Sequence, residues 1–339
     1  MKRDYWEIVQ AMPAAALADL MHRFEDLGLY GIWSPQLHAP PFPTLAAAAM
    51  VTSKLKLGTG IALAFVRSCV ETALGALDID RLSGGRMVLG LGTSIRDWNE
   101  RAHGVVYGKP VMHLREVVTS VRAIIEKGHT GELGQIDGEY HKLDLRGFST
   151  GRKPVRSSIP IYVPALFEKT VTLAADAADG LLGHPVWSLK WIQEQSARLD
   201  KLLAAKGRKR ADFHVNLWNY IAIANDRKQA IGDMRGTVAF YSSIAQYQKY
   251  YSAHGFGAQA KAASEAAARK DITAMLVAIP DEMVTTFALA GTPDEVRERV
   301  SQMWEHGNSM TLSPPQYFVP QQRMNEYREA LVETFYKAA

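Results

Sequence analysis

Short apolar segments alternate with longer helical patterns along almost the whole chain. Eight of these segments have the apolar content of buried strands, and each is followed by a stretch with apolar residues at helical spacing. Parallel strands need long crossover connections, and helices usually provide them. The predicted strands span residues 5–11, 29–33, 55–63, 86–91, 160–163, 181–182, 213–224 and 309–312. A count of eight favours a (β/α)8 TIM barrel over a doubly wound sheet.

The chain length suits this fold as one domain. The 339 residues contain no linker and no break in composition, and α/β barrels of this size routinely form a single domain. We therefore expect one barrel domain over residues 1–339. Residues 225–290 are helical over a longer stretch than one barrel helix requires, and the part up to residue 279 is Ala-rich. This segment predicts a helical insertion after strand seven.

The charge balance is only mildly basic. The chain has 39 Lys and Arg against 35 Asp and Glu, a formal net charge of +4. Without a basic stripe, this charge argues against nucleic-acid binding, and it is compatible with a small anionic ligand. No apolar run approaches the roughly 18 residues of a membrane-spanning helix, and no apolar segment of a signal peptide follows the first residues. We expect a cytoplasmic protein that does not bind membranes.

The chain has one cysteine, Cys69. An intramolecular disulfide is therefore impossible. Cys69 lies in an apolar helical pattern, which favours a packed thiol over a reactive one. No spacing of His, Cys, Asp and Glu is typical of a metal site, so we expect no bound metal.

Residues 80–94 contain the clearest candidate for a ligand-binding loop. A helical pattern ends at Leu82, residues 83–85 predict a turn, and residues 86–91 predict a strand. Residues 92–94 then form a short loop of small residues, where backbone N–H groups can approach a phosphate. In a (β/α)8 barrel, ligands bind at the C-terminal ends of the strands. The corresponding segments after other strands are residues 34–38, 60–62, 165–169 and 183–184.

Five segments carry a resemblance to a known family. They are Leu57-Gly-Thr-Gly-Ile61, residues 77–93 (Leu-Asp-Ile-Asp-Arg-Leu-Ser-Gly-Gly-Arg-Met-Val-Leu-Gly-Leu-Gly-Thr), Ile159-Pro-Ile-Tyr-Val163, residues 174–180 (Ala-Ala-Asp-Ala-Ala-Asp-Gly) and Ala290-Gly-Thr-Pro-Asp-Glu-Val296. In these segments and in their order, the chain resembles the luciferase-like monooxygenase superfamily. That superfamily is a set of (β/α)8 enzymes that depend on a flavin or on coenzyme F420.

The resemblance implies a cofactor site made of three segments. In the family, the third strand ends in a bulge with a non-prolyl cis peptide that supports the cofactor ring. Gly60 and Ile61 take that position, with Ala62 beside them. Two loops match those that hold the side chain and phosphate of the cofactor, namely Gly92, Thr93 and Ser94, and Ala165, Leu166 and Phe167. The second loop opens a helix, whose N–H groups and dipole favour an anion. The resemblance also implies that the insertion acts as a lid and that the protein is a homodimer.

Two departures from the family pattern affect the residues that could transfer a proton. Family members often have Trp-x-x-Asp-His after strand two, whereas this chain has Gln36 in place of the acid and His38 two positions later. The usual Arg-His-Pro after strand three is Arg67-Ser-Cys69 here.

Three side chains therefore remain as candidates for catalysis. His38 and His184 follow predicted strands, and histidine titrates near neutral pH, so each is a candidate general acid. Each could equally be a structural histidine with its hydrogen bonds satisfied. Gln36 could bind a heteroatom of the cofactor ring, or it could cap its own loop.

The resemblance implies an oxidoreductase that transfers a hydride between coenzyme F420 and a small organic substrate. We favour coenzyme F420 because residues 82–93 and 280–300 are close to that branch of the superfamily. The alternative is an FMNH2-dependent luciferase-like flavin monooxygenase. A third hypothesis is a barrel that binds a ligand without catalysis, because the Asp-His pair is missing and a fold does not fix a function.

Overall fold

The structure is a computed structural model, and it describes residues 3–337. The contacts within it divide the chain into two compact units. The N-terminal unit consists of residues 4–182 and 197–216, and the C-terminal unit consists of Arg3 and residues 183–196 and 217–337. The single domain expected over the whole chain stays a prediction.

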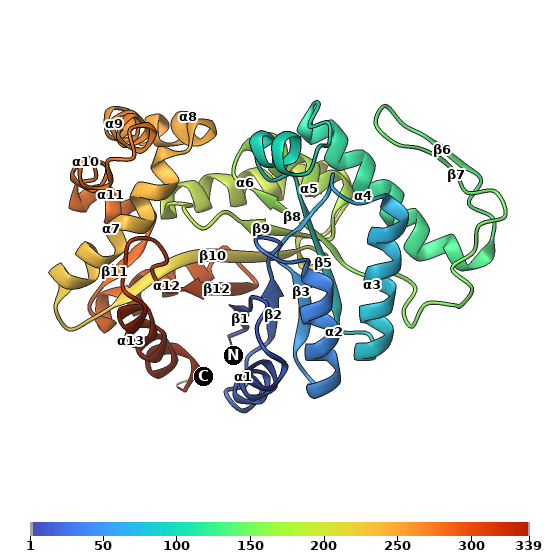
Figure 1. Cartoon of the computed structure of the whole chain (residues 1–339), viewed down its shortest axis with the longest axis horizontal. Coiled ribbons are helices and arrows are strands. Elements are labelled where there is room, and N and C mark those ends of the chain that lie inside the picture. The colour runs from blue at the N-terminus through green and yellow to red at the C-terminus, as the bar shows by residue number, and fades with distance from the viewer. Residues whose placement is uncertain (1–2, 338–339) are drawn as a thin grey trace. The chain divides into compact units, whose positions relative to one another are not determined.

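The N-terminal unit contains a parallel sheet whose strands are connected by helices (Figure 1). Its strands are β1 (Tyr5–Ile8), β2 (Gly31–Ser34), β3 (Lys56–Thr59), β4 (Ala62–Leu63), β5 (Met87–Gly92), β8 (Ile161–Ala165) and β9 (Gly180–Gly183). Strand β2 pairs with β1 and β3, and β5 pairs with β3, β4 and β8, always in parallel. The helices are α1 (Ala14–Asp26), α2 (Pro41–Val51), α3 (Cys69–Ser83), α4 (Pro110–Lys127) and α5 (Glu168–Ala177). The short strands β6 (Gln135–Asp137) and β7 (Lys142–Asp144) form an antiparallel hairpin.

The C-terminal unit contains β11 (Leu289–Gly291), β12 (Ser309–Ser313) and most of β10 (His214–Ile223), with β10 and β11 in parallel register. Its helices are α7 (Arg227–Ser243), α8 (Gln248–Ala253), α9 (Gly257–Ala268), α10 (Ile272–Val277), α11 (Asp281–Phe287), α12 (Pro293–Trp304) and α13 (Gln321–Leu331), followed by a π-helical turn (Val332–Tyr336). Helix α9 packs against α7, α8 and α10, and the four helices gather in one group (Figure 1). Helix α6 (Leu189–Ala205) belongs partly to each unit.

Local sequence signals fix several helix ends. The hydroxyl of Ser68 accepts a hydrogen bond from the backbone N–H of Glu71 and caps the start of α3, and Gly84 ends that helix at a φ of 67°. Thr292 and Glu295 form a reciprocal capping box at the start of α12. None of the helices within residues 3–337 combines the length and apolar content needed to cross a bilayer.

The structure corrects two boundaries. The predicted strand over residues 55–63 is two strands, β3 and β4, because the chain bulges at Gly60 and Ile61. The helical pattern expected up to residue 290 is wrong at its end, because Leu289–Gly291 is strand β11. A three-residue Leu-Ala-Gly segment shows no period that would distinguish a strand from a helix.

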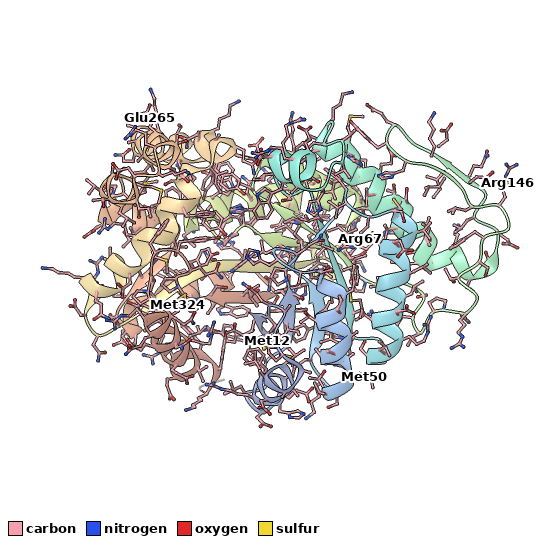
Figure 2. The ribbon with its side chains drawn as sticks, in the orientation of Figure 1. Met12, Met50, Arg67, Arg146, Glu265 and Met324 are labelled. Atoms are coloured by element: carbon pink, nitrogen blue, oxygen red, sulfur yellow. The ribbon has the colours of Figure 1, made fainter. Side chains whose placement is uncertain are left out.

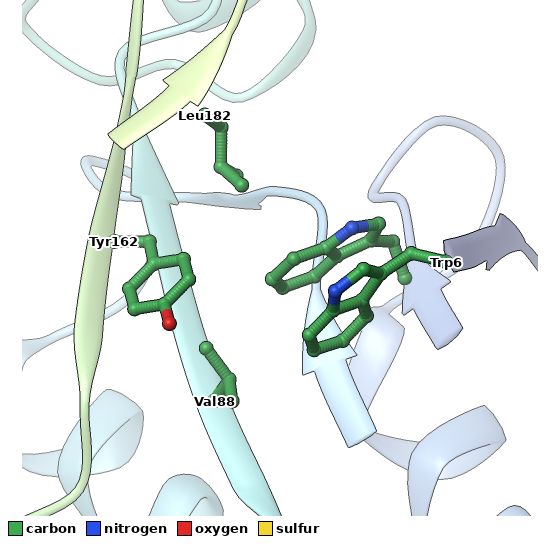
Figure 3. Close-up of a cluster of buried hydrophobic side chains, with 5 residues drawn as sticks. Trp6, Val88, Tyr162 and Leu182 are labelled. Carbon is green, nitrogen blue, oxygen red and sulfur yellow. The ribbon is translucent and has the colours of Figure 1, made fainter. Parts of the chain in front are cut away.

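Two stacked indole rings belong to a buried core cluster of the N-terminal unit (Figure 3). The ring centroids of Trp6 and Trp33 are 3.9 Å apart and the planes differ by 9°. A Cβ atom on Gly58 would lie 2.1 Å from the Trp33 ring, so only glycine lets the indole lie against β3. The rest of this core cluster consists of Val88, Tyr162 and Leu182, from β5, β8 and β9.

Candidate active site

The bulge between β3 and β4 is held by its neighbours on both sides. The peptide bond between Gly60 and Ile61 is cis, so the cis peptide that the resemblance implies is confirmed at the expected position. The N–H of Gly60 donates to the carbonyl oxygen of Ser34 at 2.9 Å. Ala62 is paired with Leu91 of β5. The side chain of Ile61 packs on the core cluster beneath the bulge.

The loop after β2 also holds the bulge, and Gln36 is the residue that does so. Its N–H donates to the carbonyl oxygen of Ile61 at 3.1 Å. Its side-chain oxygen accepts hydrogen bonds from the N–H of Leu63 at 2.9 Å and from Nη1 of Arg67 at 2.8 Å. These contacts fix the loop after β2, and a bond from Gln36 to a heteroatom of the cofactor ring stays a prediction. Arg67, labelled in Figure 2, is half-buried, and this burial lowers its pKa.

Gly92 is where three strand ends meet. A Cβ atom at this position would lie 2.6 Å from Cδ1 of Ile61 and 2.7 Å from Cγ of Pro164. The end of β5 is therefore in close contact with the bulge and with the end of β8. The structure thus brings Gly60, Ile61, Ala62 and Gly92 together, next to the segment that begins at Ala165.

The loop over residues 92–94 has its carbonyl groups turned toward the protein. Nδ2 of Asn99 donates to the carbonyl oxygen of Thr93 at 2.8 Å. The hydroxyl of Tyr107 donates to the carbonyl oxygen of Ser94 at 2.9 Å. In a trans peptide, the N–H points opposite to the preceding carbonyl. The N–H groups of Ser94 and Ile95 therefore point away from Asn99 and Tyr107, and no protein acceptor for either occurs in the described chain. Such amides can bind an anion.

The second predicted loop leads into helix α5. Ala165 and Leu166 are buried, and Phe167 is the residue before the first turn. Among the described residues, no side chain caps this helix start, which leaves its first N–H groups available to an anion. Glu168 in the first turn forms an ion pair with Arg198, so its charge is partly compensated.

The two candidate histidines have different surroundings. His38 is exposed on the loop after β2, and no hydrogen bond to it is found within residues 3–337. His184 belongs to the C-terminal unit, where its Nε2 lies 3.1 Å from the hydroxyl of Tyr247. Burial lowers the pKa of His184 to about 3, so its imidazole is neutral near pH 7. In the described part of the chain, no three His, Cys, Asp or Glu side chains are grouped to hold a metal ion.

A chain of hydroxyl groups lies in the same unit as His184. The hydroxyl of Tyr220 donates to Oε1 of Gln316 at 3.0 Å. It must therefore accept the hydrogen bond from the hydroxyl of Tyr241, also at 3.0 Å. The rings of His184 and Tyr241 form a T-shaped pair, with centroids 5.6 Å apart and an interplanar angle of 89°. Burial raises the pKa of both tyrosines, so they remain neutral donors.

The sequence analysis missed Asn99 and Tyr107, which hold the loop after β5. They lie in residues 95–109, a segment with neither helical nor strand periodicity. The pi-helical turn Trp98–Ala102 carries Asn99 inward, where the residue is fully buried. A buried asparagine in an irregular segment is distinguishable only after the chain has folded, because its partners are backbone carbonyls.

Comparison with solved structures identifies the fold. The coenzyme F420 dependent tetrahydromethanopterin reductase from Methanopyrus kandleri superposes with a TM-score of 0.78 over 98% of each chain, at 22% sequence identity. The strand and helix order of the present chain and this similarity confirm the (β/α)8 fold class predicted from the sequence.

Comparison of sequences identifies the family. A 5,10-methylenetetrahydromethanopterin reductase of Archaeoglobus fulgidus is 31% identical over 280 residues, which cover 80% of each chain. An uncharacterized protein of Mycobacterium tuberculosis is 33% identical over 289 residues, or 83% of this chain and 84% of that protein. The family model for luciferase-like monooxygenases matches residues 3–309. The chain therefore belongs to the luciferase-like monooxygenase family, which confirms the resemblance noted in its sequence.

Proposed function

We propose that this protein is an oxidoreductase that transfers a hydride between coenzyme F420 and a small organic substrate. Its family membership supports an enzyme of this general class. The relative from Archaeoglobus fulgidus is named a reductase, and the solved structure from Methanopyrus kandleri is named coenzyme F420 dependent. These names support coenzyme F420 over FMN for this chain.

One structural observation carries the proposal. Gly92 lies against Ile61 and Pro164 with no room for a side chain, and the amides of Ser94 and Ile95 point away from the protein side of their loop. A flat cofactor ring would rest on Gly60–Ala62, and its phosphate would bind the amides after β5 and the first turn of α5. When bound, the cofactor supplies or accepts the hydride. The role of these residues is to bind it and to orient it.

We further propose that His184 handles the proton that accompanies hydride transfer. It follows β9, and in this fold the C-terminal ends of the strands carry the reactive groups. The N–H of Val186 donates to Nδ1 of His184, which leaves the proton of the neutral ring on Nε2, beside Tyr247. A neutral imidazole can stabilise the charge that develops on a substrate oxygen by donating a hydrogen bond from this N–H, and transfer of the proton itself would leave an imidazolate that regains a proton from solvent. His38 has no such partner within residues 3–337, so it serves as the comparison.

Titration of the purified protein with coenzyme F420, and separately with FMN, tests the choice of cofactor. We expect the absorbance and fluorescence of coenzyme F420 to change on binding, with no such change for FMN. Binding of FMN alone would reverse the choice and favour the flavin monooxygenase. Binding of neither would favour the barrel without catalysis.

Two matched variants test the proton donor. We expect His184→Gln to lower the rate of coenzyme F420 turnover at least about tenfold, within the range of a lost general acid, while the affinity for the cofactor stays the same. His38→Gln should leave both unchanged. The reverse pattern would transfer the role to His38.

We also propose that the protein is a homodimer, on the basis of its family alone. Sedimentation equilibrium at several protein concentrations measures this directly. A mass of one 37.5 kDa chain at every concentration would contradict it.

A further inference from the structure

The segment that carries His184 is a tight turn after β9. The N–H of Trp187 donates to the carbonyl oxygen of His184 at 2.9 Å, and Pro185 takes the second position of this turn, which suits its fixed φ. The N–H of Val186 donates to Nδ1 of the His184 ring at 3.5 Å. The backbone and the ring of His184 are therefore both held by peptide groups of the turn.

The hydroxyl of Tyr250 binds two neighbouring peptide groups of the same segment. It donates to the carbonyl oxygen of Val186 at 2.8 Å and accepts a hydrogen bond from the N–H of Ser188 at 2.9 Å. The carbonyl of Val186 and the N–H of Trp187 belong to one peptide group. The oxygen of this group is bound by Tyr250 and its N–H binds His184. A single peptide group therefore connects Tyr250 to His184.

Tyr250 lies on helix α8 of the insertion and is closely packed. The residue is 1% exposed, and its ring lies against those of Trp191, His254 and Phe287, with centroids 4.5 to 5.5 Å apart. Burial raises the pKa of Tyr250, so the hydroxyl keeps the proton that it donates. The packing fixes the ring, and the hydroxyl therefore meets the turn in one position.

Two neighbours of Tyr250 bind the same segment. The hydroxyl of Tyr247 lies 3.1 Å from Nε2 of His184. Nδ1 of His254 lies 2.9 Å from the carbonyl oxygen of Tyr250, which can only accept, so Nδ1 carries the proton of the neutral ring. Nε2 of His254 then accepts the hydroxyl of Ser188 at 2.8 Å. This part of the insertion therefore contacts the turn at its ring, at its backbone and at its end.

We propose that Tyr250 is a positioning residue, whose hydroxyl holds the turn after β9 and thereby the imidazole of His184. All of these residues belong to the C-terminal unit. The inference rests on the proposed function for the role of His184 in the reaction, whereas the order of the turn is a property of the protein alone.

The next residue of α8 supplies a matched control. Tyr251 is also fully buried, and its hydroxyl has no hydrogen-bond partner within residues 3–337. Its ring packs on Phe287, as that of Tyr250 does, with centroids 4.8 Å apart. Tyr250→Phe and Tyr251→Phe therefore each delete one buried oxygen from the same helix, but only the first deletes bonds to the turn.

Amide hydrogen exchange on the protein without cofactor tests the proposal. In Tyr250→Phe, the N–H of Ser188 loses its acceptor and should exchange about two- to tenfold faster, the worth of one hydrogen bond. The N–H of Trp187 binds His184 and not Tyr250, yet it should also exchange faster, because the turn that holds it loosens. Tyr251→Phe should leave both amides as they are in the wild type.

The amide of Ala224, which donates to the carbonyl oxygen of Gly291 at 3.1 Å, reports on the rest of the unit. Its exchange should be the same in the wild type and in both variants. Unchanged exchange at Trp187 in Tyr250→Phe would overturn the proposal, since the hydroxyl would then affect only its own bonds. Acceleration of Trp187 and Ala224 by the same factor would also overturn it, because the effect would be a general loss of stability.

A double-mutant cycle connects the turn to the reaction. We expect Tyr250→Phe to lower the rate of coenzyme F420 turnover about two- to tenfold, in line with one lost hydrogen bond, while the affinity for the cofactor stays the same. In the His184→Gln background the same substitution should have no further effect, because Tyr250 acts through His184. An equal loss of rate in both backgrounds would overturn the positioning role. Because exchange is measured without cofactor, a failure of coenzyme F420 to bind would contradict the proposed function and leave the exchange test valid.

Discussion

Arg67 donates a hydrogen bond of 2.8 Å to the side-chain oxygen of Gln36, which also accepts the N–H of Leu63. One neutral oxygen is thus the hydrogen-bond acceptor for both a half-buried guanidinium and a backbone N–H beside the cis peptide. The Asp that family members often have at this position would accept the same hydrogen bonds with a negatively charged carboxylate. In this chain an amide fixes the same loop without bringing a carboxylate into the site.

Removal of this oxygen should destabilise the protein. Gln36→Ala leaves the N–H of Leu63 and the guanidinium of Arg67 without their acceptor, which costs about 1–3 kcal/mol for a buried unsatisfied group. Urea unfolding measures the change in the free energy of unfolding. Leu37→Ala is the matched control, because Leu37 is 47% exposed and its loss should change this free energy by about 0.5 kcal/mol or less. Equal unfolding of the two variants would contradict the role of Gln36.

A methyl group at Gly92 should disturb the site. The added Cβ would lie 2.6 Å from Ile61 and 2.7 Å from Pro164, so strand ends must move apart. We expect Gly92→Ala to cost about 1–3 kcal/mol of stability and to weaken coenzyme F420 binding about tenfold or more, which is a loss of about 1.4 kcal/mol.

Gly232 provides the control for that substitution. A Cβ atom at Gly232 of α7 meets nothing within 4 Å. Because alanine is the better helix former, Gly232→Ala should stabilise the protein by up to about 1 kcal/mol. Thermal unfolding and cofactor titration of the two variants, side by side, measure the effects. An unchanged affinity of Gly92→Ala for coenzyme F420 would contradict the placement of Gly92 in the cofactor site.

His184 should make the stability of the protein depend on pH. Burial lowers its pKa to about 3, whereas an unfolded histidine titrates near about 6.5. Between these values the unfolded chain binds a proton that the folded protein does not. The contribution of His184 to the free energy of unfolding is therefore fully present above about pH 6.5. It decreases as the pH is lowered toward 3, by up to about 1.4 kcal/mol per pH unit.

Urea unfolding at a series of pH values from 5 to 8 measures this contribution. Other buried histidines act in the same direction, so the informative quantity is the difference between the wild type and His184→Gln. We expect the variant to lose less stability on acidification. Parallel pH profiles would show that the pKa of His184 is the same in the folded and unfolded states.

Cys69 should be unreactive in the folded protein. The residue is fully buried, and burial raises the pKa of its thiol to about 11, so little thiolate is present near pH 7. A thiol reagent should modify no cysteine in native buffer and one per chain in denaturant. Rapid labelling of the native protein, with retention of its secondary structure, would contradict the packed position.

Much of the fold could be predicted because it depends on local patterns. The apolar strands and the turn over residues 83–85 carry their signal within a few residues. The strand at Leu289–Gly291 could not be predicted in this way. Its three residues are a strand only because they pair with Ile221–Ile223 of β10, about 70 residues earlier in the chain.

The candidate site was predictable in its backbone and less so in its side chains. The segments at Gly60 and Gly92 were located because their order in the chain matches a family, and the structure brings them together. The contact between His184 and Tyr247 joins residues that lie 63 positions apart, and nothing in either local pattern marks it. Periodicity identifies the apolar face of a helix, but it does not reveal which polar side chain on that face meets a partner.

The stacked rings of Trp6 and Trp33 give the protein an intrinsic optical probe. Two indoles whose centroids are 3.9 Å apart couple their excited states. The chain has seven tryptophans, and this pair belongs to the core cluster on which Ile61 packs. Their exciton signal in circular dichroism should vanish in Trp33→Phe. Because the pair lies directly under the bulge, the same signal should shift when a ligand changes the bulge, with no added label.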